Sequence, residues 1–466
     1  MMRKLLFYTI LTFISCGSLY AQGEYDKCYF GTAGIDFTGG NPYVLTNSQM
    51  IGVESAASMC SQNGDLLFYS NGGDSPTVPA SVGAVWNANH VIMENGILGS
   101  ESGCISSFDG AVAFPKSPSN SNFDGSASPS NSTYYIFMRD CVESSVTTPS
   151  YNSGLTYCEI DMDANNGLGK VVNKGNQVVP FDPGFGLSTN HEPLAAISNA
   201  NDDGWFVFSY TLDSLYSIEV DDNGIGNIKV HVEGAKRIVF SPSKEHVIVG
   251  GILYNYNNLL NELSVIRSFP ESSFAFSPNG KVLYAIGSGN LNQYDLTATN
   301  IFGSKVTINS GVTASRLYLT PDARVYLFNV DAGSLPGVIN CPNSLGTNCD
   351  FSMTSFNLGG KQAGHVFTNI PANYLFYNGA DCNLSVNDYK AESIDFEVYP
   401  NPSNGNITIS MSKFENHIPF NVVSLEGKVV FDGMVRSHKE IVDLRGVERG
   451  IYILEVNGKK KRLVLR

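Results

Sequence analysis

A hairpin pattern that recurs three times in the middle of the chain constrains the fold more than any other feature. Each copy has an alternating run of apolar residues, a Ser/Thr-Pro turn and a second alternating run. The copies are RIVFSPSKEHVIVG from Arg237, SFAFSPNGKVLYAIG from Ser273 and SRLYLTPDARVYLFN from Ser315. Proline fixes φ at such a turn, and a period of two predicts strands buried on one face. The turn prolines are 36 and 43 residues apart, which is typical of the four-stranded blades of a β-propeller.

Weaker copies of the hairpin begin upstream, near Ala57, Ser132 and Pro193. At about 40–50 residues per blade, the region from 24 to 380 holds seven to nine blades. Allowing for polar inserts near 117–131 and 335–350, we expect an all-β, seven-bladed propeller over residues 22–380. We expect the run near Tyr29 to join the segment near Tyr374 in one blade, because ring closure removes exposed sheet edges. A string of β-sandwiches is the alternative, and the regular Ser-Pro spacing argues against it.

Four segments of this region, YFGTAGIDF, GDLLFYSNGG, GLTYCEIDMDANNGLG and FSPNGKVLY, resemble those of a family of exported WD40-like or YVTN-like propeller proteins from Bacteroidetes. The resemblance covers most of residues 28–378. It implies a propeller exposed at the cell surface, and it implies no agreed ligand or reaction.

The pattern changes in the last part of the chain, over residues 395–466. Short alternating runs separated by glycine turns predict at least five strands and a small Ig-like β-sandwich. The residues that define the pattern are Tyr399, Pro400, Asn401, Pro402, Gly405, Gly427, Asp443, Leu444, Gly446, Gly450 and Tyr452, followed by the closing run KKKRLVLR. In this order they resemble the type A C-terminal sorting domain of the type IX (Por) secretion system. The resemblance implies the translocon and its sortase as partners, and attachment to surface lipopolysaccharide or release. The alternative is a generic adhesion sandwich.

Residues 1–21 have the pattern of a secretory signal peptide. Arg3 and Lys4 precede an apolar run of about ten residues, and a cleavage site follows at Ala21. Such a run is too short to span a bilayer, and we expect no transmembrane segment elsewhere. Cys16 leaves a lipoprotein site as a weaker alternative. We expect the sortase to cut in the polar linker at 381–394, and the mature protein to be secreted or held at the outer-membrane surface.

Charge is distributed unevenly along the chain. The whole sequence has 29 basic and 43 acidic residues, for a net charge of −14. Residues 22–393 have a net charge of −18, whereas residues 394–466 have a net charge of +2. An acidic main domain disfavours nucleic acid as a partner, because its binders need a basic surface. The difference also supports two separate modules.

Eight cysteines remain after cleavage at Ala21, and an even number in an exported chain favours disulfides. We expect Cys28 with Cys382 to join the ends of the main domain, Cys141 with Cys158 to link neighbouring strands, and Cys341 with Cys349 to close a loop. The spacings do not match a zinc site.

Motifs for catalysis and cofactors are weak. His191-Glu192 begins HEPLA and lacks the second histidine of HExxH, and no GxSxG, GxGxxG or P-loop sequence follows a strand. Asp161, Asp163 and Asn165 have the spacing of a calcium loop, but Val172 stands where a bidentate glutamate belongs, which favours a hairpin turn. We therefore expect no cofactor, with calcium as a minor alternative. Trp86 and Trp205 could stack on a sugar, although core packing is the simpler interpretation.

Three hypotheses about function follow. The first is a non-enzymatic surface propeller that binds a protein or a polysaccharide. The second is an extracellular hydrolase or lyase with carboxylates in the propeller channel. The third is a structural or adhesion component of the cell surface. Propellers serve all three roles, and the shortage of catalytic motifs favours binding, so no catalytic residue is assigned.

Overall fold

The structure is a computed structural model that describes residues 23–38, 42–74, 82–118, 132–141, 153–180, 192–211, 214–233, 237–353, 355–376, 396–411, 418–424, 429–456 and 459–466. The chain divides into two compact units, residues 1–383 and 384–466. The described residues form strands and short 3-10 turns, without an α-helix. The expected signal peptide at 1–21 and linker at 381–394 lie outside the described residues, so the predicted domain boundaries stay predictions.

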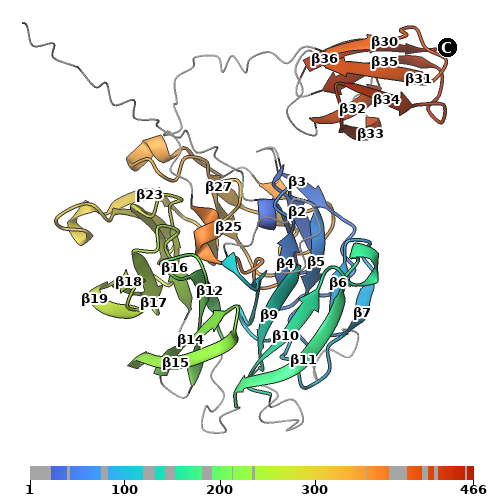
Figure 1. Cartoon of the computed structure of the whole chain (residues 1–466). Helices are drawn as coiled ribbons and strands as arrows, with labels where there is room; N and C mark the ends of the chain where they lie inside the picture. Colours follow the sequence, from blue (N-terminus) through green and yellow to red (C-terminus); the bar gives the residue numbers. More distant parts are fainter. Residues whose placement is uncertain are drawn as a thin grey trace, which may run out of the picture. The chain divides into compact units, whose positions relative to one another are not determined.

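The first unit is a β-propeller of antiparallel sheets, and Figure 1 shows these sheets around a common centre. The first half begins with the three-stranded sheet β1 (Lys27–Phe30), β2 (Ala33–Asp36) and β3 (Tyr43–Leu45). Three groups of four strands follow: β4 (Ala57–Cys60), β5 (Leu66–Ser70), β6 (Ala84–Asn87) and β7 (Ile92–Ile97); β8 (Ala111–Pro115), β9 (Thr133–Arg139), β10 (Leu155–Asp161) and β11 (Lys170–Val179); and β12 (Ala195–Ser198), β13 (Trp205–Thr211), β14 (Ser214–Asp221) and β15 (Gly224–Glu233).

The second half of the propeller has three further four-stranded sheets and a short strand pair. The sheets are β16 (Ile238–Phe240), β17 (His246–Val249), β18 (Ile252–Asn257) and β19 (Glu262–Ser268); β20 (Ser273–Phe276), β21 (Val282–Gly287), β22 (Asn290–Asp295) and β23 (Val306–Ser310); and β24 (Arg316–Leu319), β25 (Val325–Phe328), β27 (Gly337–Ile339) and β28 (Phe351–Ser352). The pair is β26 (Ser334–Leu335) with β29 (Phe356–Asn357). The all-β propeller prediction is confirmed. The count of seven blades stays a prediction. It is reached only if the three-stranded sheet β1–β3 is counted as one blade beside the six groups of four strands.

The Ser/Thr-Pro repeats form the first hairpin of three sheets, as the sequence predicts. In each, the residue before the proline closes the turn: the amide nitrogens of Ser241, Ser277 and Thr320 donate to the carbonyl oxygens of His246, Val282 and Arg324. The fourth turn residue has positive φ, at Lys244 (61°), Gly280 (71°) and Ala323 (61°). These hairpins place β16, β20 and β24 next to one another, each as the first strand of its sheet, which we call its inner strand.

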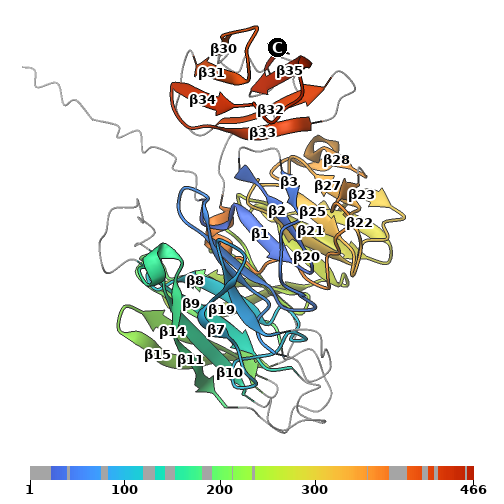
Figure 2. The ribbon, with the colours of Figure 1, turned by 90° about the vertical axis from the view of Figure 1, so that its right-hand side faces the viewer.

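The ring closes where the N-terminal sheet meets the segment at 362–376, which we call the closing segment. The Thr368 hydroxyl donates to the Tyr29 carbonyl at 2.7 Å, and the Thr32 amide donates to the Gln362 carbonyl at 3.0 Å. The Phe367 ring lies 4.8 Å from that of Phe30. In Figure 2 the blue strands β1–β3 lie beside β25 and β27, in agreement with the core that they share. The two ends meet, but the expected shared blade is not found among the described residues, because β1–β3 form a sheet of their own and the closing segment has no assigned strand.

Two neighbouring sheets are also joined at their outer edges. Strands β7 and β11 pair in parallel, so that β4–β11 form one eight-stranded sheet. The Lys170 ammonium lies 2.7 Å from the Glu94 carboxylate, and the Asn95 side chain donates to the Val171 carbonyl at 2.8 Å. These polar contacts close the gap between the rims of two sheets.

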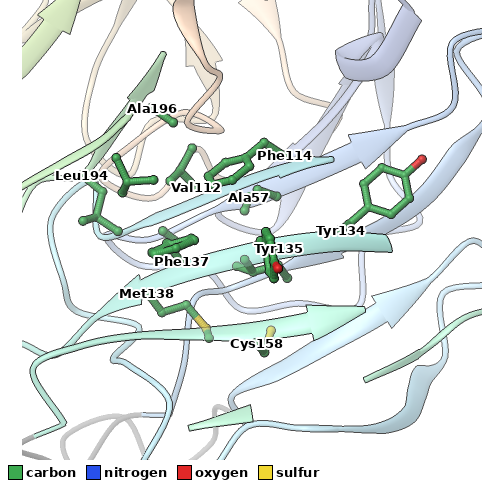
Figure 3. Close-up of a cluster of buried hydrophobic side chains, with 14 of the residues drawn as sticks. Ala57, Val112, Phe114, Tyr134, Tyr135, Phe137, Met138, Cys158, Leu194 and Ala196 are labelled. Carbon is green, nitrogen blue, oxygen red and sulfur yellow. The ribbon is translucent and has the colours of Figure 1, made fainter. Parts of the chain in front are cut away.

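Aromatic side chains fill the space between the sheets. Figure 3 shows side chains of β4 and β8, among them Ala57, Val112 and Phe114, packed with those of β9. The Phe114 ring stacks on Phe137 at 5.5 Å and lies 4.8 Å from Trp205. Burial of such rings is the main favourable contribution to folding in a β-rich chain of this kind.

The second unit is a sandwich of two β-sheets, as the sequence predicts. One sheet has β30 (Phe396–Tyr399), β31 (Asn406–Met411) and β34 (Lys439–Asp443). The other has β32 (Ile418–Ser424), β33 (Val429–Val435), β35 (Gly450–Val456) and β36 (Lys459–Leu465). Alternate residues of both sheets form one buried core.

The expected disulfide pairs are wrong. Cys141 is bonded to Cys104, with Cα atoms 5.4 Å apart, and Cys158 is a buried free thiol. The reason is strand register: Cys158 lies opposite Ile136 in the middle of β9, whereas Cys141 follows the end of that strand. Cys28 and Cys349 are also free thiols, so neither Cys28–Cys382 nor Cys341–Cys349 forms, although Cys341 is disulfide-bonded. Cys382 lies outside the described residues.

Candidate functional site

Charged residues at the starts of the inner strands and in the closing segment meet at one end of these strands. The Asp109 amide donates to the Glu54 carbonyl at 2.9 Å, and the Leu194 amide donates to the Asp109 carbonyl at 3.1 Å. These bonds bring together the starts of β4, β8 and β12. We call this end the charged mouth, and it comprises Glu54, Asp109, Glu192, Arg237, Arg316 and His365.

An ion pair in the charged mouth joins the starts of β8 and β16. Arg237 Nε lies 3.1 Å from Asp109 Oδ2, and the guanidinium stacks 4.6 Å above the Tyr318 ring. Asp109 has a φ of 51°, a conformation that few non-glycine residues adopt and that here turns its carboxylate toward Arg237. Burial lowers the pKa of Arg237, but Tyr318 and Asp109 outweigh it and raise the pKa overall. Arg237 is therefore a permanent cation.

A second charged group surrounds His365 in the closing segment. His365 Nδ1 lies 2.7 Å from Glu54 Oε1, and Nε2 lies 3.4 Å from Asp331 Oδ2. Arg316 donates to the His365 carbonyl at 2.8 Å and stacks 3.8 Å from the Phe108 ring. The imidazole is thus held between two carboxylates and is 30% exposed.

Glu192 is a buried member of the charged mouth. The side chain is buried, and its Oε2 accepts a hydrogen bond from the Phe108 amide at 2.8 Å. This places the second residue of the HEPLA sequence in a structural role, while His191 lies outside the described residues.

A narrow cavity of about 90 Å³ lies below the charged mouth, between four inner strands and the closing segment. Its polar wall is formed by Asp109, Arg237, Tyr318, Thr368 and Asn369. Its apolar wall includes Leu194, Ala196, Phe240, Phe276, Leu317 and Ile370. Arg237 Nη1 is buried and has no hydrogen-bond partner in the described part of the chain.

The other residues singled out from the sequence lie elsewhere. Trp86 and Trp205 are 6% and 1% exposed, and the Trp205 indole donates to the Pro115 carbonyl at 2.9 Å, so both belong to the core. Asp161 and Asp163 lie in the β10–β11 hairpin, where the Asp163 amide donates to Asp161 Oδ1 at 2.9 Å. Among the described residues, no group of three or more His, Cys, Asp or Glu side chains is arranged to hold a metal.

In the second unit, Asn401 has a definite structural role. Its side chain donates to the Arg462 carbonyl at 2.6 Å and accepts from the Val464 amide at 2.9 Å. The peptide bonds before Pro400 and Pro402 are cis. Through its two hydrogen bonds, Asn401 attaches the loop after β30 to the last strand of the chain.

Glycines and a tyrosine of the same pattern close the remaining turns. Gly405 has a φ of 107°, and its carbonyl accepts from the Leu444 amide at 2.6 Å. The Tyr452 hydroxyl donates to the Glu448 carbonyl at 2.7 Å, beside Gly450. Arg445 holds the exposed Asp443 carboxylate and lowers its pKa to about 2. Gly446 has open space around it, and Gly427 lies outside the described residues.

Sequence reasoning missed the charged mouth, although the repeat contained a signal. Arg237 and Arg316 occupy the same position in their copies, five residues before the turn proline, where the third copy has Ser273. Aligning the three copies would have placed both arginines at the start of an inner strand. Nothing in the local pattern indicates that His365 or Asp109 joins them.

The tail and the fold define the class to which the chain belongs. Residues 397–466 match the family model of the secretion system C-terminal sorting domain. The protein is thus a β-propeller-like protein exported by the type IX secretion system to the cell surface or the extracellular space. No helix in the described parts of the chain has the length and apolarity needed to cross a membrane.

Solved structures similar to this chain are distant in sequence. A protein from Lactobacillus plantarum is 13% identical, with a TM-score of 0.44 over 74% of this chain and 99% of its own. A putative 6-phosphogluconolactonase from Bacteroides fragilis is 10% identical, with a TM-score of 0.43 over the same shares. PorZ, a surface component of the type IX system of Porphyromonas gingivalis, is 10% identical, with a TM-score of 0.28 over 94% of this chain and 68% of its own. No curated protein matches the sequence significantly.

Proposed function

We propose that the protein is a non-enzymatic binding module at the cell surface, whose protein or polysaccharide ligand docks at the charged mouth. The observation that supports this most directly is that the carboxylates of the mouth are already engaged. Asp109 is paired with Arg237, Glu54 with His365, and Glu192 with a backbone amide. Groups held in this way present a fixed surface, which favours recognition because little ordering is needed on binding.

A glycan array and a protein pull-down with the full chain would test this proposal. Arg316→Ala removes a cation of the mouth, and we expect it to weaken binding about tenfold, as loss of one charge-assisted hydrogen bond does. Arg267→Ala is the matched control. Arg267 belongs to the outer strand β19, where its guanidinium stacks 4.3 Å from the Phe302 ring, and it is not part of the charged mouth. Equal binding by both variants would place the ligand elsewhere.

One observation favours the second hypothesis, an extracellular hydrolase. A partly exposed imidazole that is hydrogen-bonded to a carboxylate, as His365 is to Glu54, has the arrangement of a general base. A hydrolase substrate panel would test it. Turnover that is lost in His365→Asn but retained in Arg267→Ala would favour the enzyme over the binding module.

We further propose how the chain is processed. A signal peptide is removed after Ala21, and the sortase cuts within 381–394 before attachment to lipopolysaccharide or release. The polar composition of this linker and its place between two compact units support the cut. N- and C-terminal sequencing of the mature protein checks both positions, and an intact Arg466 on the mature surface protein would contradict the cut.

A further inference from the structure

We propose that the cavity below the charged mouth binds a carboxylate group carried on a short apolar body, with Arg237 as its cationic partner. The inference deepens the proposed binding function by assigning a ligand chemistry to one part of the site. The inference rests on the proposed function in one respect, namely that the charged mouth is a recognition surface.

The first argument is an unused donor. Asp109 Oδ2 engages Arg237 Nε at 3.1 Å, whereas Nη1 is buried without a partner in the described part of the chain. A buried charged donor without an acceptor is costly, so such groups usually have a partner from outside the chain. Arg237 lines the cavity, which leaves room for an acceptor beside it.

The second argument is local charge. The Arg237 guanidinium stacks 4.6 Å above the Tyr318 ring, and both residues line the cavity. Burial and Asp109 raise the pKa of the Tyr318 hydroxyl, whereas Arg237 and Arg316 lower it. Two guanidinium cations therefore act on this wall of the cavity. A carboxylate is the acceptor that forms the strongest hydrogen bonds with a guanidinium, so it fits this end better than a neutral group or a cation.

The third argument is size and polarity. A volume of about 90 Å³ equals the share of about three water molecules in the liquid, which allows about four to six heavy atoms. Away from Arg237 the walls are apolar and include Phe240, Phe276 and Leu317. Apolar walls favour a hydrocarbon body over three ordered waters. A short-chain carboxylate meets both requirements, whereas a sugar acid is too large and its ring is too polar.

Titration calorimetry on the full chain tests the inference with butyrate as the probe. Butyramide has the same shape without the charge, and we expect it to bind at least about tenfold more weakly. Glucuronate carries the same carboxylate on a larger and polar body, so we expect it to bind more weakly than butyrate. Tighter binding of glucuronate would contradict the assignment of an apolar body.

Three variants locate the bound carboxylate. Arg237→Lys keeps a cation opposite Asp109 but removes the second donor nitrogen, and we expect at least a tenfold loss of butyrate affinity in a folded protein. Tyr318→Phe removes only the buried hydroxyl, and we expect a loss of about threefold to tenfold. Arg267→Lys at the outer strand is the control and should leave the affinity unchanged.

Equal affinities for butyrate and butyramide, or equal affinities of Arg237→Lys and Arg267→Lys, would overturn the inference. So would the absence of butyrate binding at millimolar concentration. If the full chain still captures a ligand in the array while butyrate fails, only the cavity assignment is wrong and the proposed function stands.

Discussion

At the scale of single residues, His231 shows how the position of a side chain on a sheet sets its protonation. Its Nε2 lies 2.8 Å from the Ser217 hydroxyl, and its ring stacks 5.1 Å from Phe208. Burial, with Lys229 as a smaller contribution, lowers the pKa of His231 to about 4. In the unfolded chain a histidine titrates near 6.5, so unfolding takes up a proton between these values.

Stability should therefore fall as the pH is lowered from about 6.5 toward about 4. The slope of the free energy of unfolding against pH measures the number of protons taken up on unfolding. We expect His231→Gln to lower this number by up to about one. Urea unfolding at several pH values measures it. Both tryptophans lie in the propeller, so their fluorescence reports on that unit alone. An unchanged slope in the variant would contradict the prediction.

For Asp26 we expect the opposite dependence of stability on pH, in nearly the same pH range. Burial raises its pKa to about 6, with Lys27 lowering it and Asp36 raising it. The folded state then binds the proton more tightly than the unfolded state, so the contribution of this group to stability falls as the pH rises from about 4 through 6.

We expect Asp26→Asn to stabilise the propeller by on the order of 1 kcal/mol at pH 7.5 and to have little effect at pH 4. The same tryptophan-detected urea unfolding checks this. Asp36→Asn serves as the comparison, because it removes the partner that lies 3.4 Å from the Lys27 ammonium and should destabilise. A stability loss in Asp26→Asn at pH 7.5 would show that the carboxylate is needed in its charged form.

At the scale of elements, some features follow from local pattern and others do not. Ser277, Pro278 and Gly280 form their turn through bonds within a few residues, so the hairpins could be predicted. The Cys104–Cys141 bond depends on where two loops meet, and the contact between Thr368 and Tyr29 joins positions 339 apart in the chain. Contacts of this kind depend on how the sheets pack around the whole ring, so they cannot be predicted from any short stretch of the sequence.

The contact between Asn401 and β36 predicts how the sorting domain responds to mutation. Loss of its two hydrogen bonds in Asn401→Ala should destabilise this domain by about 1 kcal/mol, since the side chain is exposed. Hydrogen exchange at the Val464 amide measures the effect directly, and secretion of the variant shows its consequence for export. Asn404→Ala in the same loop is the control. Equal exchange rates of the Val464 amide in the two variants would show that Asn401 does not hold the loop to β36.

At the scale of the whole molecule, Asn369 links the closing segment to other blades. Its side chain donates to the Leu194 carbonyl at 2.9 Å and to the Asp109 carbonyl at 3.4 Å. Asn369→Ala removes the side-chain donor from the Leu194 carbonyl, while the Asp109 carbonyl keeps the Leu194 amide as its partner. We expect a loss of about 1–3 kcal/mol in the free energy of unfolding of the entire propeller. Tryptophan fluorescence, which reports on the propeller alone, should show one transition at a lower urea concentration than in the wild type. Two transitions in this fluorescence would mean that the ring does not unfold as a unit.

The place of the closing segment in the sequence has a consequence for the order of synthesis. Its residues, 362–376, are among the last of the propeller to leave the ribosome, yet they contact β1 and the starts of β4, β8 and β12. A nascent chain that ends before Gln362 therefore lacks the piece that joins its first sheet to its last. Such a chain stays open until the closing segment has been synthesised, so the propeller can complete its fold only after nearly all of its own residues have been made.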